Sequence, residues 1–89
     1  MIRPLNENVN YIDRIALIIN KFSIKESVNI PIDLPLFDDG YLDSLNALNV
    51  IEELESEFNL RFEMEDLTAE NFGSIEQINQ FLHSKLQKA

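Results

Sequence analysis

The sequence has 89 residues, no cysteine and a formal net charge of −9. Nucleic-acid binding needs lysines and arginines that displace counterions from phosphates, so a chain this acidic nearly excludes that class of protein. Without cysteine there are no disulfides or thiolate metal sites. No apolar run approaches the roughly 20 residues of a membrane span, and the first residues, MIRPLNEN, lack the pattern of a signal peptide. We therefore expect one cytoplasmic domain over residues 1–89, large enough for a single core, and a monomer.

The first predicted helix covers residues 8–22. Its apolar residues recur at spacings of three and four, which is typical of an amphipathic helix: Val9, Ile12, Ile15, Ala16, Ile19 and Phe22. Asn6 or Asn8 is suited to cap its start.

A long connection follows, over residues 23–43. Pro31 and Pro35 push the residues before them toward extended backbone, so this stretch is not helical. Loops of about twenty residues are unusual in small domains and tend to be functional. Asp38 and Asp39 precede Gly40 as in a turn. Five apolar residues are expected to anchor the loop on the core: Ile30, Ile32, Leu34, Leu36 and Phe37.

The second predicted helix covers residues 44–58. Five residues form its core stripe: Ala47, Val50, Ile51, Leu54 and Phe58. Leu45 and Leu48 lie off this stripe, on the face that holds Glu52 and Glu55. These leucines either form an apolar contact patch with an acidic surround or pack beneath the neighbouring loop, and the sequence leaves both possibilities open.

Two further helices complete the chain, a short one over residues 65–72 and a last one over residues 74–87. Gly73 ends the third, and SIEQ from Ser74 to Gln77 has the form of a capping box for the fourth. The fourth helix is expected to bury four apolar positions: Ile75, Ile78, Phe81 or Leu82, and Leu86. No strand-like alternation occurs, so we predict an all-α, four-helix bundle with a long loop between helices one and two.

The negative charge is concentrated in the middle of the chain. Residues 33–76 hold thirteen acids and a single base, Arg61, whereas the flanks hold three acids and six bases. Such a segment can steer a basic partner, or it can simply keep a small domain soluble.

Ser44 stands between a glycine-containing loop and an apolar helix. At this position it can serve as a helix cap or as a reactive group. A serine nucleophile needs a nearby base, and the only histidine, His83, lies on the last helix, where a packed or solvated role is favoured. There is no Gly-x-Ser-x-Gly elbow, and DDGYLD lacks the full spacing of a calcium loop. We therefore expect no intrinsic enzymatic activity; if Ser44 reacts, another enzyme acts on it.

The stretches LFDDGYLDSLNALNVIEELESEF and EDLTAENFGSIEQI resemble the acyl carrier protein family over roughly residues 36–82. The resemblance implies that Ser44 carries 4′-phosphopantetheine, with Asp43 beside it, and that cargo is held as a thioester. A phosphodiester at the start of a helix fits the free N–H groups and the macrodipole there, and an unmodified Ser44 could cap the same groups.

The resemblance also assigns partner recognition to the second helix. It implies two apolar contacts and four acids: Leu45, Leu48, Glu52, Glu53, Glu55 and Glu57. The expected partners are a phosphopantetheinyl transferase, a ligase or transferase that loads an acyl or aminoacyl group, and downstream synthases with basic docking surfaces.

Three departures separate the chain from fatty-acid carriers. Tyr41 and Leu42 stand between Gly40 and Asp43, where those proteins usually have one residue. Asn46 and Asn49 occupy positions that are often acidic in those proteins. Glu52 occupies a position where an apolar contact is common. These features favour a stand-alone acyl carrier of a fatty-acid-like or specialised polyketide or lipid pathway. An aminoacyl or peptidyl carrier, including a D-alanyl carrier, is the alternative, and an unmodified acidic adaptor is a more distant one.

Overall fold

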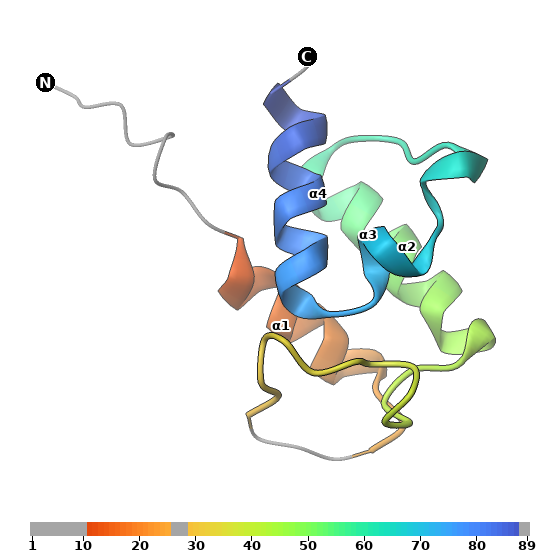
Figure 1. The fold of residues 1–89 in the computed structure, drawn as a ribbon. Coiled ribbons are helices and arrows are strands. Elements are labelled where there is room, and N and C mark those ends of the chain that lie inside the picture. Colours follow the sequence, from red (N-terminus) through yellow and green to blue (C-terminus); the bar gives the residue numbers. More distant parts are fainter. Residues whose placement is uncertain (1–10, 26–28, 88–89) are drawn as a thin grey trace, which may run out of the picture.

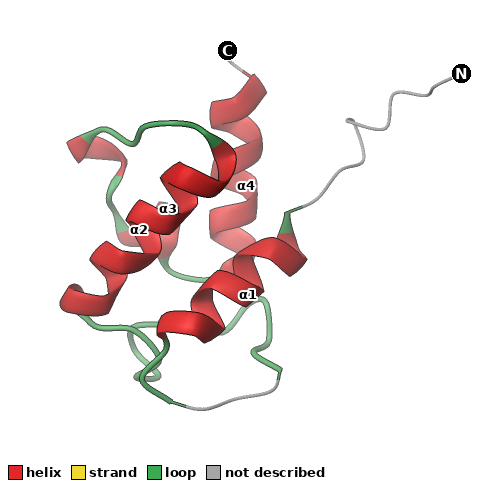
Figure 2. Ribbon diagram, turned by 180° about the vertical axis from the view of Figure 1, so that it is seen from behind, coloured by secondary structure: helices red, strands yellow, loops and turns green. Residues whose placement is uncertain are grey.

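The computed structural model describes residues 11–25 and 29–87. Its elements follow in the order α1 (Ile12–Phe22), α2 (Ser44–Phe58), the 3₁₀ turn η2 (Met64–Asp66), α3 (Ala69–Phe72) and α4 (Ile75–Gln87). Within the described ranges there is no strand (Figure 2). The predicted all-α bundle, with a long loop between the first two helices and a short third helix, is confirmed (Figure 1).

The core lies between α1, α2 and α4, because α1 packs against both of the other long helices and α3 packs against α4. The most deeply buried side chains come from all three long helices and from the loop: Ile15, Ile19, Leu36, Val50, Leu54, Ile75, Ile78 and Leu82. On α2, Val50 and Leu54 are fully buried, whereas Ala47, Ile51 and Phe58 at the edges of the predicted stripe are half-buried. On α4, Leu82 takes the core position and Phe81 lies at its margin.

Helix α1 begins at Ile12, later than the sequence pattern indicates. Tyr11 has non-helical backbone angles, and its N–H donates a 2.8 Å hydrogen bond to Asn79 Oδ1 on α4. A residue inside a continuous helix would donate to the carbonyl four residues earlier, so this tertiary contact replaces a helical one. The predicted caps Asn6 and Asn8, together with Val9, lie outside the described residues.

The predicted third helix over residues 65–72 is two shorter pieces. The turn η2 ends at Asp66, and Thr68 then caps α3 by accepting a 3.3 Å hydrogen bond from the N–H of Asn71. Thr68 has extended backbone angles, which interrupt any continuous helix.

The long loop is fastened to the turn between α3 and α4, at the end of the bundle where α4 begins (Figure 1). The N–H of Leu36 donates to the carbonyl of Gly73 (2.8 Å), and the N–H of Glu76 donates to the carbonyl of Ile32 (2.9 Å). Of the five expected anchors, Ile30 and Leu36 are buried and Leu34 is partly buried. Ile32 and Phe37 are 41% and 40% exposed, so the anchoring prediction is wrong for these two.

The start of α4 agrees with the sequence pattern in part. Ser74 is buried, and its Oγ accepts a 3.1 Å hydrogen bond from the N–H of Gln77, as one half of a capping box. In the part of the chain that the structure covers, no helix has the length and apolar character that crossing a membrane requires.

Candidate functional site

The loop before α2 turns sharply at residues 36–40. The N–H groups of Tyr41 and Leu42 both donate to the carbonyl of Leu36, and Gly40 has a φ of 82°, a conformation that glycine adopts without strain. Asp38 and Asp39 lie in this turn, as predicted. Leu42 is buried and anchors the end of the turn on the core. The positions of Asp43 and Ser44 at the start of α2 are therefore fixed.

Asp43, and not Ser44, caps α2. The Asp43 carboxylate accepts 3.0 Å hydrogen bonds from the N–H groups of Leu45 and Asn46. The expectation that an unmodified Ser44 caps these groups is therefore wrong, because Ser44 is already the first helical residue. The same two N–H groups are also no longer free to bind a phosphate.

Asn46 completes the cap and ties it to α1. Its Oδ1 accepts a 2.7 Å hydrogen bond from the N–H of Asp43, and its Nδ2 donates a 2.6 Å bond to the carbonyl of Phe22, the last residue of α1. The sequence analysis missed this role. The signal was an aspartate followed three residues later by an asparagine, which is a variant of the capping box.

The side chain of Ser44 is left exposed at this corner, and no hydrogen bond to its hydroxyl occurs within the described residues. Ser44 lies at the edge of a cavity of about 410 Å³. The cavity lining is almost entirely apolar, and its main contributors are Phe37, Ala47, Leu48, Ile51, Leu67 and Phe72. A group attached to Ser44 thus finds both open solvent and an apolar recess beside it.

Leu45 and Leu48 are 74% and 55% exposed, which excludes packing beneath the loop. Leu48 borders the cavity together with the half-exposed Phe37 and Leu67. An apolar rim therefore surrounds the cavity beside Ser44.

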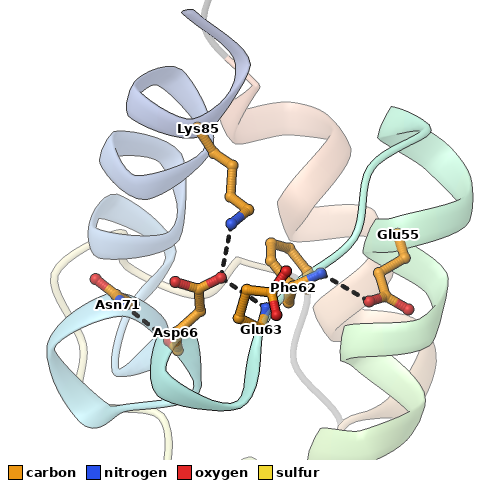
Figure 3. Close-up of polar contacts among 6 residues, drawn as sticks. All are labelled: Glu55, Phe62, Glu63, Asp66, Asn71 and Lys85. Carbon is orange, nitrogen blue, oxygen red and sulfur yellow. Dashed lines mark hydrogen bonds and ion pairs between the residues drawn. The ribbon is translucent and has the colours of Figure 1, made fainter. Parts of the chain in front are cut away.

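The four acids implied in partner binding have different surroundings. Glu53 pairs with Lys21 at 3.1 Å, and Glu57 pairs with Arg14 at 2.6 Å, so both face α1. Glu55 accepts a 2.9 Å hydrogen bond from the N–H of Phe62 and so fastens the chain that follows α2 (Figure 3). Glu52 is exposed and makes none of these internal contacts.

His83 belongs to an aromatic contact and not to the surroundings of Ser44. Its ring lies 4.9 Å from the ring of Tyr11, centroid to centroid. Among the described residues no group of three His, Cys, Asp or Glu side chains is suited to hold a metal ion.

Comparisons with known proteins agree with this arrangement. The family described as "Phosphopantetheine attachment site" matches residues 16–82. D-alanyl carrier proteins of Streptococcus pyogenes serotype M5 (strain Manfredo) and serotype M1 are 36% identical to the chain over 55 residues, which cover 62% of this chain and 70% of theirs.

The fold also resembles a solved structure. A chain in the crystal structure of Bradyrhizobium japonicum glycine:[carrier protein] ligase complexed with glycylated carrier protein superposes with a TM-score of 0.69. The match has 22% sequence identity and covers 79% of this chain and 95% of that one.

Proposed function

The chain belongs to the phosphopantetheine carrier proteins, which hold 4′-phosphopantetheine covalently, and we propose that Ser44 is its attachment residue. The exposed, unbonded hydroxyl at the start of α2 is the observation that carries the proposal. When bound, the arm supplies a terminal thiol, a group that the chain itself lacks.

The surroundings of Ser44 fit such a group. The hydroxyl has no structural task, because Asp43 caps the helix, and the transferase can approach it from solvent. A phosphate on Ser44 would lie at the positive end of the α2 macrodipole, which favours negative charge. It would not accept hydrogen bonds from the N–H groups of Leu45 and Asn46, because these already donate to Asp43. The chain's own contribution is therefore to hold the hydroxyl at a fixed place on a rigid helix.

We propose further that the cargo is an aminoacyl group. The relatives support this alternative better than the fatty-acid-like or specialised acyl carrier that the sequence favours, because the curated relatives named above are D-alanyl carriers. The partners are then a phosphopantetheinyl transferase and an aminoacyl:carrier ligase.

Leu45, Leu48 and Glu52 are the proposed contacts for these partners. They are exposed on the first turns of α2, next to Ser44. Glu53, Glu55 and Glu57 belong to the same proposed face through their negative charge, although each also makes an internal contact.

Intact mass spectrometry tests the attachment. After incubation with coenzyme A and a broad-specificity phosphopantetheinyl transferase, the wild type should gain the mass of one arm per chain, and Ser44→Ala should gain none. A wild type that gains no mass supports the unmodified adaptor. The modified protein is then offered to an amino acid:carrier ligase and to a fatty acyl:carrier ligase, and faster loading by the fatty acyl enzyme would contradict the aminoacyl proposal.

A further inference from the structure

The acids of α2 lie on different sides of the helix. The helix carries four glutamates and no basic residue, so its own sequence presents only negative charge. At about 100° per residue, Glu53 and Glu57 lie about 40° apart, whereas Glu52 lies about 100° away from Glu53. Glu52 is exposed to solvent, and the other two face α1, which packs against α2.

Two cations of α1 lie on the side that holds Glu53 and Glu57. Arg14 donates to Glu57 Oε2 from both Nε, at 2.9 Å, and Nη2, at 2.6 Å, and its guanidinium carbon lies 4.7 Å from the centroid of the Phe58 ring. Lys21 Nζ donates to Glu53 Oε2 at 3.1 Å. These contacts place one positive charge beside each of the two carboxylates.

Both pairs are partly exposed, with side chains 37–58% accessible to solvent. Such pairs contribute little to folding stability. They nevertheless change the electrostatic field, because a carboxylate with a cation at contact distance acts on a distant charge as a dipole and not as a full negative charge. Salt screens what remains of the field beyond about 10 Å. An approaching basic partner therefore meets an α2 that is less acidic than its sequence indicates.

Three exposed acids keep their full charge: Glu52 on α2, and Asp38 and Asp39 in the turn before it. No ion pair or hydrogen bond of their carboxylates occurs among the described residues. Glu55 also has no cation beside it, but its carboxylate accepts the N–H of Phe62. The field that a basic partner meets is thus strongest around the turn and the exposed side of α2.

We infer that Arg14 and Lys21 are specificity-determining residues, which reduce the contribution of Glu57 and Glu53 to electrostatic docking. The partner that fits carries basic residues opposite the turn before α2 and opposite Glu52. A partner whose basic residues also reach the α1 side of α2 is disfavoured. The inference rests on the proposed attachment at Ser44, and it concerns which enzymes dock there.

The field itself can be measured in the unmodified protein. A cationic nitroxide in solution gathers where the potential is negative, so the ratio of proton relaxation by a cationic and by a neutral nitroxide reports the local potential. In Lys21→Met, this ratio at the Glu53 side-chain protons should rise about twofold at low salt, as for one charge freed at the surface. In Arg14→Met, the same rise is expected at Glu57. Unchanged ratios would overturn the inference.

The consequence for docking is tested with a broad-specificity phosphopantetheinyl transferase. Arg14→Met combined with Lys21→Met removes both cations and keeps an apolar side chain at each position. The KM of the transferase for this variant should fall about threefold at low salt with kcat unchanged, because exposed charges act mainly on encounter. The difference should disappear at high salt. An unchanged or higher KM at low salt would overturn the inference.

Arg61→Met is the matched control. It removes one positive charge from an exposed residue that makes no hydrogen bond or ion pair among the described residues, so it frees no carboxylate. It should lower the KM less than Lys21→Met does, and Lys21→Arg should restore the wild-type value. In a Glu53→Gln background, Lys21→Met should lower the KM no further than Arg61→Met does.

An equal fall in Arg61→Met and Lys21→Met would overturn the inference, because total charge and not the paired glutamates would then govern docking. A failure of the attachment proposal has a different signature. It would show as absent mass gain in the wild type, whereas the nitroxide measurement uses the unmodified protein and needs no attachment.

Discussion

The side-chain amide of Asn46 donates a 2.6 Å hydrogen bond to the carbonyl of Phe22, at the last residue of α1. The same amide accepts the N–H of Asp43 through its oxygen, so a single side chain links the end of one helix to the start of the next. The position of Ser44 relative to the bundle depends on this link.

Asn46→Asp should lower the free energy of unfolding by about 1–2 kcal/mol. The aspartate still accepts the N–H of Asp43, but it cannot donate to the Phe22 carbonyl and it places a second carboxylate next to the first. Urea denaturation measures the change. Asn49→Asp adds the same charge at an exposed position of α2 and should change stability by less than about 0.5 kcal/mol. Equal effects of the two substitutions would show that charge alone, and not the link to α1, is responsible.

Asp43→Ala should cost about 1 kcal/mol of stability, because the N–H groups of Leu45 and Asn46 lose their acceptor. Ser44→Ala should cost less than about 0.5 kcal/mol, because its hydroxyl holds no cap. Urea denaturation of both variants shows which of the two residues caps α2. A larger loss in Ser44→Ala would contradict the assignment of the cap.

Glu52→Lys should reduce kcat/KM for phosphopantetheinyl transfer several-fold at low salt, and the loss should shrink as salt is added, since exposed charges act mainly on encounter. Asp13→Lys is the matched control: it changes the net charge equally at an exposed position, but it lies in the first turn of α1, whereas the start of α2 is tied to the other end of α1 at Phe22. The control should have the smaller effect. If the two variants slow transfer equally, the total charge and not the face around Ser44 governs docking.

Gly73→Ala should destabilise the fold by about 1–3 kcal/mol, as overpacking does. An added Cβ would lie 2.5 Å from the carbonyl oxygen of Ala69 and 2.7 Å from Gln77 Oε1. The glutamine side chain can rotate away, but the Ala69 carbonyl belongs to the backbone of α3 and must shift. Thermal denaturation measures the loss, and Ser84→Ala, at an exposed position of α4, should be nearly neutral. A stable Gly73→Ala would mean that α3 moves easily.

The helices with strong local signals could be predicted from the sequence. Both ends of α2 agree with the prediction, because a turn precedes it and Asn59, in a left-handed conformation, ends it. The start of α4 agrees within one residue, because Ser74 caps it as its motif predicts. Periodicity and capping are properties of neighbouring residues, and a sequence displays them directly.

The errors arose where distant residues decide the outcome. The start of α1 depends on Asn79, which takes the N–H of Tyr11, and the exposure of Ile32 and Phe37 depends on how the loop bonds to the α3–α4 turn. At the site, the sequence indicated Ser44 but not the roles of Asp43 and Asn46, since a capping box of aspartate and asparagine also matches an ordinary turn. The internal contacts of Glu53, Glu55 and Glu57 likewise require the packed helices.

Because Asp43 secures the beginning of α2, the fold does not depend on the Ser44 hydroxyl. The chain is therefore expected to fold before any arm is attached, so that a transferase meets a finished helix and not an unfolded segment.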